Sequence, residues 1–292
     1  MTVIGKRAEI DLESILFATD FSSAAEKAGL YVRLLAQRYG STVHLIHVVD
    51  LSAAFQTPDA GISIDIFRKA GEDSLERAKA QLTSAKIHVQ STQCEGVNPA
   101  EEIVQNAKEK SVDLIVTGTR GQTGLARLAF GSMAEQLIHH AECPVLTVGP
   151  EVELPAREFR RIVYATDFSH EAAKAAIYAL SFAHDSGAHI YLCHVLPETD
   201  HKHPVDGEGL IEKFTAALQS LVPDIAREWC EPECVLEHGG ASDGILLLAH
   251  RVKADLIVLG ARRMSHWFNI LKAGIAFDVI GAAKCPVLTI CG

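Results

Sequence analysis

Short apolar runs alternate along the first half of the chain with longer segments whose apolar residues recur at helical spacing. The short runs are Ile15–Phe17, Val43–Val49, Leu114–Thr117 and Val145–Val148. They are nearly continuous and rich in β-branched residues, as is typical of parallel strands buried on both faces. The pattern therefore predicts a buried strand at each of these places.

The longer segments between these runs predict amphipathic helices. These helices begin at Ser23, cover Phe67–Thr83 and Ala100–Lys110, and begin again at Ser132. Both serines are followed three residues later by a glutamate, which is the pattern of a capping box. Strands that alternate with helices imply right-handed crossovers and an open, doubly wound α/β sheet. In such a sheet, ligands bind beyond the carboxyl ends of the strands, where the strand order reverses.

The pattern of the first half returns in the second half. Ile15–Ser22 reappears as Ile162–Ser169 with an offset of 147 residues, and Cys143–Thr147 reappears as Cys285–Thr289 with an offset of 142. The smaller second offset indicates a five-residue deletion in the second copy. The chain is therefore a tandem of two homologous doubly wound domains.

The two copies predict domains at 1–150 and 158–292. Between them, Gly149–Arg157 is charged, lacks apolar periodicity and contains Pro150 and Pro155, as expected of a join.

Composition narrows the class of protein. The chain has 292 residues, is 48% hydrophobic and 6% aromatic, and carries a formal net charge of −10. It is too apolar for a disordered chain, and no apolar stretch reaches the ~20 residues that span a bilayer. The acidic balance argues against a nucleic-acid partner, because binding to phosphates needs a basic stripe.

Two further features favour a cytoplasmic location. Met1–Leu12 mixes basic and acidic residues and has no long apolar segment of the kind found in signal peptides. The seven cysteines are odd in number and scattered, which favours reduced thiols over a disulfide framework.

Two predicted strand ends carry residues suited to a nucleotide. The first run leads into Ala18–Asp20, and Leu114–Thr117 leads into Gly118 and Gly121, with nine residues between Gly121 and the pair Gly131–Ser132. Glycines let a backbone approach a ligand closely, and a helix that starts near Ser132 offers free N–H groups to phosphate. A carboxylate at Asp20 can accept hydrogen bonds from a ribose hydroxyl or an adenine amino group. Together these residues predict a mononucleotide cradle.

The spacing of these glycines resembles that of the universal stress protein family. A G-x2-G-x9-G-S pattern follows the run Leu-Ile-Val-Thr and leads to Cys-Pro-Val-Leu-Thr-Val, and the first strand ends in Thr-Asp. The resemblance covers both halves and implies a Rossmann-like fold of the adenine nucleotide alpha hydrolase type, with five parallel strands per domain. Some family members bind ATP and others do not, and an intact glycine pattern marks the binders.

The resemblance implies a role for each matching residue of the first half. Asp20 and Val48 would face the adenosine, Ala18 and Thr19 would line the wall, and Met133 would offer a backbone N–H. The residues that would contact ribose and phosphates are Gly118, Gly121, Gly131 and Ser132. The implied cofactor is ATP, with the presence of Mg²⁺ left open.

The second half departs from the glycine pattern. It retains Asp167, Val195 and Gly260, but three positions have changed: Arg263, Ala273 and Gly274 stand where the first half has Gly121, Gly131 and Ser132. We therefore expect nucleotide binding in the first domain and a structural or regulatory role for the second. Alternatively, Arg262 and Arg263 serve another anion.

Several of these residues also have simpler interpretations. Asp20 and Ser132 are both residue types that cap helices, and capping alone would explain them. His47 and His194 end buried strands, so we expect hydrogen-bonded core histidines there. Cys230 lies close to a second cysteine, but their spacing is not that of a zinc site, and no metal site is expected.

The familiar enzyme motifs do not occur in the sequence. It has no GxxxxGK[ST] loop, no GxSxG elbow and no HExxH helix, and nothing places a general base beside a nucleophile. We expect a protein that is not an enzyme, or at most one that hydrolyses ATP slowly. A nucleotide-free interaction module is the competing interpretation.

The resemblance also implies how domains pair. Family members pair through the terminal strand, so Val145–Val148 and Val287–Ile290 would form an intramolecular pseudo-dimer. Association of two chains into a homodimer is left open, and no membrane partner is expected.

Overall fold

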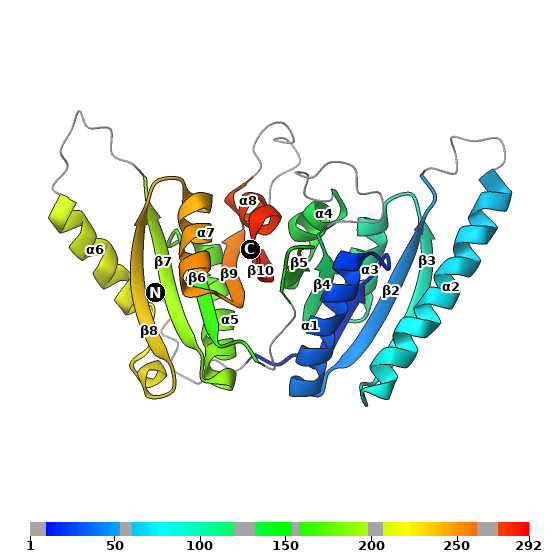
Figure 1. The fold of residues 1–292 in the computed structure, drawn as a ribbon, viewed down its shortest axis with the longest axis horizontal. Coiled ribbons are helices and arrows are strands. Elements are labelled where there is room, and N and C mark those ends of the chain that lie inside the picture. Colours follow the sequence, from blue (N-terminus) through cyan, green and yellow to red (C-terminus); the bar gives the residue numbers. More distant parts are fainter. Residues whose placement is uncertain are drawn as a thin grey trace. The chain divides into compact units, whose positions relative to one another are not determined.

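The computed structural model describes residues 10–52, 60–119, 132–153, 158–197, 207–261 and 274–291. These residues form two compact units, one within Asp11–Pro155 and one within Ala156–Gly292. Each unit is an α/β unit in which helices flank a parallel sheet (Figure 1).

The first unit has the five-stranded parallel sheet expected of a doubly wound domain. Its strand order is β3-β2-β1-β4-β5, and each neighbouring pair is parallel. The elements are β1 (Ser14–Ala18), α1 (Ser23–Tyr39), β2 (Thr42–Asp50), α2 (Ala60–Ser84), β3 (Val89–Gly96), α3 (Pro99–Glu109), β4 (Leu114–Gly118), α4 (Ser132–His140) and β5 (Val145–Val148).

The second unit repeats this arrangement. Its strand order is β8-β7-β6-β9-β10, again with parallel pairs. The elements are β6 (Arg161–Ala165), α5 (His170–Ser186), β7 (His189–Leu196), α6 (Gly207–Ser220), the 3₁₀ turn η2 (Asp224–Glu228), β8 (Glu231–His238), α7 (Ala241–Val252), β9 (Leu256–Ala261), α8 (Ile275–Ala282) and β10 (Val287–Cys291). The predicted tandem of two doubly wound domains is therefore confirmed.

An aspartate joins the amino ends of the two central strands in each unit. Asp113, just before β4, accepts a hydrogen bond of 2.9 Å from the backbone N–H of Ser14. Asp255, just before β9, accepts bonds of 2.9 and 3.0 Å from the N–H groups of Arg160 and Arg161. Burial raises the pKa of the Asp255 carboxyl, and these backbone bonds oppose the rise. The repeated Asp-Leu-Ile-Val motif thus fixes the register at the centre of each sheet.

Strand β3 is an edge strand that the hydrophobic pattern did not indicate. Its sequence, VQSTQCEG, is polar, and most of its side chains are half-buried. It lies at one end of the unit's strand order, so only one neighbour in that unit pairs with it. An edge strand of this kind needs less apolar surface than a strand buried on both faces.

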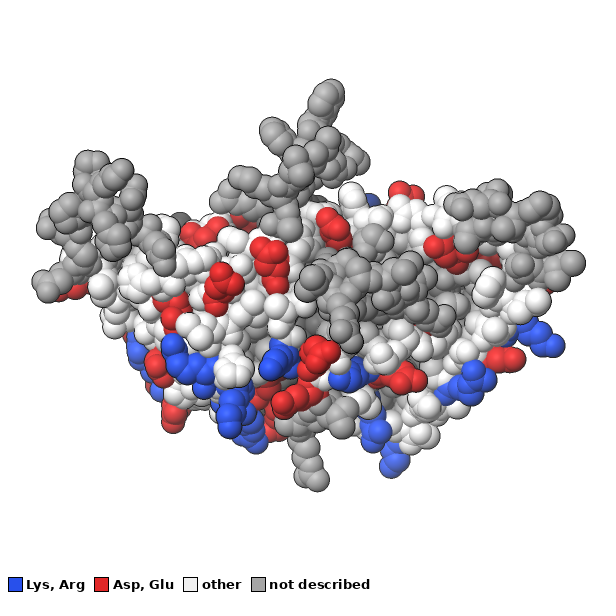
Figure 2. Space-filling model, turned by 45° about the horizontal axis from the view of Figure 1, so that its top comes forward, with Lys and Arg blue, Asp and Glu red and all other residues white. Residues whose placement is uncertain are grey.

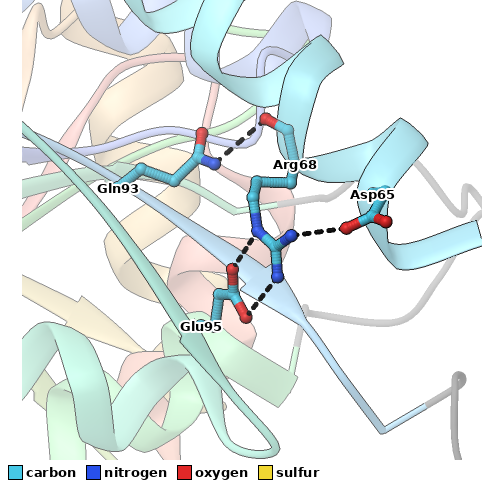
Figure 3. Close-up of polar contacts among 4 residues, drawn as sticks. All are labelled: Asp65, Arg68, Gln93 and Glu95. Carbon is cyan, nitrogen blue, oxygen red and sulfur yellow. Dashed lines mark hydrogen bonds and ion pairs between the residues drawn. The ribbon is translucent and has the colours of Figure 1, made fainter. Parts of the chain in front are cut away.

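A polar cluster docks helix α2 on this edge strand (Figure 3). The guanidinium of Arg68 donates to both carboxylate oxygens of Glu95, at 2.5 and 3.2 Å, and to Asp65 at 2.5 Å. The side-chain amide of Gln93 donates to the backbone carbonyl of Arg68 at 3.0 Å. The hydrogen bond from Arg68 lowers the pKa of Glu95. The cluster sets where α2 lies against β3.

The first helix starts one residue earlier than its predicted capping box requires. The N-cap of α1 is Ser22, whose hydroxyl accepts from the N–H of Ala25 at 3.3 Å. The capping box at Ser23 is therefore wrong, because Glu26 lies one position beyond the one that reaches back to the cap. Ser169 caps α5 in the same way, accepting from Ala172 at 3.2 Å.

Helix α4 begins at Ser132, as predicted, and runs to His140. The residue before it and the side chain of Ser132 lie outside the described part of the chain, so the second capping box stays a prediction. The offset of 142 places Gly274, the N-cap of α8, at the equivalent position. The two helices thus begin within one residue of each other in the repeat.

Among the described residues, no helix is both long and apolar enough to cross a membrane.

Candidate functional site at the carboxyl edge of the first sheet

The strand order of the first unit reverses between β1 and β4. The chain leaves β1 toward β2 and β3 on one side, and later returns to β4 and β5 on the other. Ala18, at the end of β1, pairs with Ile46 on one side and Thr117 on the other. The residues that follow, Thr19 and Gly118, therefore lie at the same edge of the sheet. This is the position at which open α/β sheets bind ligands.

The loop after β1 is held in an unusual backbone conformation. Phe21 has a φ of 61°, in the left-handed region that bulky residues rarely adopt. Its N–H donates to the hydroxyl of Thr19 at 3.0 Å, and the next N–H, of Ser22, donates to the carboxylate of Asp20 at 3.0 Å. The N–H of Thr19 continues the sheet by donating to Ile46 at 3.0 Å. Local hydrogen bonds thus stabilise a loop that would otherwise be strained.

Asp20 does not cap the helix that follows it. The cap is Ser22, and the carboxylate of Asp20 instead receives the N–H of that serine. Asp20 itself is half-buried, beyond the buried end of β1. The capping interpretation of Asp20 is therefore wrong.

His47 ties the end of β2 to this loop. Its Nδ1 lies 2.9 Å from the carbonyl oxygen of Thr19, and because a carbonyl only accepts, Nδ1 carries the proton. The imidazole packs against the ring of Phe21 with 4.7 Å between the ring centroids. His47 is hydrogen-bonded as expected, but its partner is the loop of the candidate site, which the sequence did not reveal.

Helix α2 also reaches His47, through Gly71. A Cβ added to Gly71 would lie 2.7 Å from Oε1 of Gln93 and 2.8 Å from Cδ2 of His47. Gln93 is the register partner of His47 on β3. The polar cluster of Figure 3 therefore docks a helix whose glycine lies directly against the imidazole.

A close contact with helix α1 requires a glycine at position 118. A Cβ at this position would lie 2.9 Å from the backbone nitrogen of Ala25 and 3.0 Å from the carbonyl carbon of Ala24. The close approach that Gly118 permits in this structure is thus to the first turn of α1. The second copy shows the same feature, because a Cβ on Gly260 would lie 2.5 Å from the nitrogen of Ala172.

The other predicted site residues differ in burial and in whether the structure describes them. Ala18 and Thr19 are buried at the end of β1, whereas Val48 on β2 and Met133 on α4 are half-buried. Ser132 begins α4, but its side chain is not among the described ones. Gly121 and Gly131 lie outside the described residues. The structure thus brings Ala18, Thr19, Asp20, Val48 and Gly118 to one edge of the sheet. The ligand contacts expected of Gly121, Gly131 and Ser132 stay predictions.

The second unit repeats the loop but differs beside it. Phe168 has a φ of 60°, and Nδ1 of His194 lies 2.8 Å from the carbonyl oxygen of Thr166. Here, however, Phe214 of α6 stacks on the imidazole with a centroid distance of 4.6 Å, where the first unit has Gly71. Arg262, Arg263 and Ala273 lie outside the described residues.

The local charge at the first unit's carboxyl edge is acidic. Asp20 follows β1 and Asp50 ends β2, whereas the charge of Glu95, near the end of β3, is offset by the Arg68 guanidinium. On the face shown in Figure 2, Asp and Glu side chains are spread among uncharged ones, and Lys and Arg gather along the lower border. An anion at this edge would therefore depend on backbone N–H groups and a helix terminus more than on the overall field. Within the described part of the chain, no cluster of His, Cys, Asp and Glu could hold a metal ion.

Known proteins resemble both halves of the chain. The model of the Universal stress protein family matches residues 12–149 and again 158–290. Universal stress protein MJ0531 of Methanocaldococcus jannaschii is 35% identical over 139 residues, covering 47% of this chain and 81% of its own length. Universal stress protein MJ0577 of the same organism is 29% identical over 153 residues, covering 47% of this chain and 94% of its own length. Each relative thus corresponds to about half of the present chain.

A solved structure resembles the whole chain. The crystal structure of a universal stress protein from Archaeoglobus fulgidus aligns with a TM-score of 0.74, covering 96% of this chain and 99% of that one at 21% sequence identity. At this identity the likeness supports the fold alone. With two family matches that together span most of its length, the chain belongs to the universal stress protein family as a tandem, two-domain member.

Proposed function

We propose that the first unit binds ATP at its carboxyl edge, between the loops that follow β1 and β4, and that the second unit has a structural or regulatory role. Some universal stress proteins bind ATP. The observation that carries the proposal is the glycine motif, which is complete at Gly118, Gly121, Gly131 and Ser132 and incomplete at the equivalent positions of the second unit.

The geometry supports this choice of edge. The half-buried carboxylate of Asp20 and the half-buried Val48 lie beside the point where the strand order reverses. Helix α4 begins at Ser132, the last residue of the glycine motif, so its first N–H groups and its positive dipole end would face a phosphate bound by the motif. In the proposed complex, Asp20 and Val48 face the adenosine, with Ala18 and Thr19 at the wall. The glycines, Ser132 and the N–H of Met133 contact ribose and phosphates.

Binding stoichiometry tests the proposal. Calorimetric titration of the full chain with ATP, with and without Mg²⁺, should give about one site per chain. Saturating ATP should also raise the melting temperature, because 100 times Kd adds about 2.7 kcal/mol of stability. No binding by folded protein would overturn the proposal and favour a nucleotide-free interaction module. Two equivalent sites would overturn the assignment of different roles to the two units.

Matched substitutions in the two units sharpen the test. Gly131→Val should abolish binding by filling the phosphate space, whereas Ala273→Val, at the equivalent position, should leave the affinity unchanged. Asp20→Asn keeps an oxygen that can accept the N–H of Ser22 but removes the charge, and should weaken binding; Asp167→Asn is its control. Equal effects within either pair would contradict a site in the first unit alone.

The Gly131→Val variant also tests ATP hydrolysis. If wild-type protein turns over ATP no faster than this variant, the result agrees with a binding protein that is not an enzyme.

The family resemblance leads to three further expectations. These are a pseudo-dimer through the terminal strands, a homodimer of chains and a cytoplasmic location. Sedimentation with and without ATP tests the homodimer.

A further inference from the structure

We propose that His47 is a positioning residue of the ATP site, acting through the carbonyl of Thr19 on the loop that carries Asp20. This inference rests on the proposed function, and it assigns to His47 a role that the glycine motif does not include.

The hydrogen bond itself is the first observation. Nδ1 of His47 lies 2.9 Å from the carbonyl oxygen of Thr19, the residue directly before Asp20. The bond runs between the end of β2 and the loop after β1, so it fixes that loop to a rigid element of the sheet. A carboxylate that must meet a ligand needs this kind of support, because a small displacement weakens its contacts.

The strain in the loop is the second observation. Phe21 has a left-handed φ of 61°, which is costly for a residue with a bulky side chain and persists when surrounding contacts hold it. His47 supplies two such contacts, the bond to Thr19 and the packing against the Phe21 ring at 4.7 Å. Without them, the loop would be expected to relax toward ordinary φ values and carry Asp20 with it.

The surroundings of His47 hold the imidazole in place. Gly71 lies so close that an added Cβ would be 2.8 Å from Cδ2 and 3.0 Å from Nε2 of the ring. Helix α2 is docked there by the Arg68 and Gln93 contacts of Figure 3. The ring thus has little room to turn, which keeps Nδ1 directed at the carbonyl.

The second unit supplies a built-in comparison. His194 makes the same bond to Thr166, at 2.8 Å, and its ring packs against Phe168 at 4.8 Å. If the histidine only stabilises the fold, the two positions should behave alike. If His47 positions a nucleotide loop, its loss should affect ATP in a way that the loss of His194 does not.

The experiment compares substitutions at both positions in the full chain. His47→Leu removes the donor and should weaken ATP binding by up to about tenfold, because the free energy that this hydrogen bond supplies to the loop must then come from binding. His47→Asn places an amide N–H near the position of Nδ1 and should restore affinity to within a few-fold of wild type. His47→Gln places its amide further out and should resemble His47→Leu. His194→Leu should lower the melting temperature without changing the affinity for ATP.

A second measurement reports on the order of the loop in the absence of nucleotide. Hydrogen exchange at the N–H groups of Phe21 and Ser22 should become faster in His47→Leu and return toward wild type in His47→Asn. In His194→Leu the faster exchange should appear at Phe168 and Ser169 instead. If wild-type protein bound no ATP but this pattern appeared, the proposed function would fail while the positioning of the loop by His47 would stand.

Three results would overturn the inference. One is equal ATP affinity in wild type and His47→Leu. Another is an Asn variant as weak as the Leu variant, which would show that the hydrogen bond is not the cause. The third is unchanged exchange at Phe21 and Ser22 in a folded His47→Leu protein.

Discussion

Gly118 and Ala25 approach each other so closely that a Cβ on the glycine would lie 2.9 Å from the backbone nitrogen of the alanine. This contact brings the end of β4 against the first turn of α1. The glycine is therefore required by helix packing, whether or not a nucleotide is bound.

Gly118→Ala should destabilise the first unit, by about 1–3 kcal/mol, because an extra methyl group in a packed site forces backbone shifts. Urea unfolding, followed by a probe in each unit, measures the change. Gly281→Ala is the control: its Cβ would meet nothing within 4 Å, and in helix α8 the change should be neutral or stabilising. A stable Gly118→Ala variant that had lost only ATP binding would contradict a packing role.

Ser22→Ala should destabilise the first unit by about 1 kcal/mol, because it removes the hydroxyl that accepts from Ala25. Ser23→Ala should cost much less, since Ser23 is exposed and is the first residue of the helix itself. Thermal unfolding of the two variants distinguishes the observed cap from the predicted capping box. A larger loss of stability in Ser23→Ala than in Ser22→Ala would support the predicted capping box instead.

Asp255→Asn should destabilise the second unit by about 1–3 kcal/mol at neutral pH, because an amide group would face one of the two N–H donors. The loss should also depend on pH. Burial raises the pKa of Asp255 above its ordinary 3.8, so the native state holds the proton more tightly than the unfolded chain does. The stability gained from this proton is present below the unfolded pKa and is lost as the pH rises through the native pKa.

The difference in unfolding free energy between wild type and Asp255→Asn should therefore grow as the pH falls from 7 toward 4. Urea titrations at several pH values measure it. A difference that shrinks on acidification would mean that the backbone hydrogen bonds outweigh burial at Asp255.

Arg68→Ala should raise the pKa of Glu95, because the hydrogen bond and charge of Arg68 lower it in the wild type. Carboxyl chemical shifts of Glu95 during an acid titration report this directly. Arg68→Lys should give an intermediate value, since lysine keeps the charge but cannot donate two parallel N–H bonds to a carboxylate. The stabilisation from this pair is present above the unfolded pKa of Glu95 and is lost as the pH falls. An unchanged pKa in Arg68→Ala would show that the contact is not formed in solution.

The sequence predicted those elements whose burial leaves a strong pattern. Ile15–Phe17 and Leu114–Thr117 lie in central strands that are covered on both faces, so their apolar runs were sufficient evidence. Strand β3 was not predicted, because an edge strand can be polar and Val89–Gly96 contains no run of apolar residues. The repeat predicted a tandem of two α/β units because the central strands and loops of the two copies retain the same residues.

The candidate site was predicted in part. The sequence singled out Asp20 and Gly118, and the structure places both at one edge. The structure adds a second reason for Gly118, its close approach to the first turn of α1, and its contact with a ligand stays a prediction. His47 was found as a hydrogen-bonded histidine without its role, because only the fold brings it to Thr19. The signal that could have revealed it was its return as His194 beside a second Thr-Asp-Phe-Ser motif.

The hydrogen bond between Ser14 and Asp113 spans 99 positions of the chain, and this separation has a consequence for synthesis. Because β1 pairs with β4, the centre of the first sheet cannot close until most of the unit has left the ribosome, and such distant pairings fold slowly. Every strand of that sheet nevertheless comes from Asp11–Pro155. The first domain can therefore complete its fold while the second is still being translated, so the two domains fold in the order in which they are encoded.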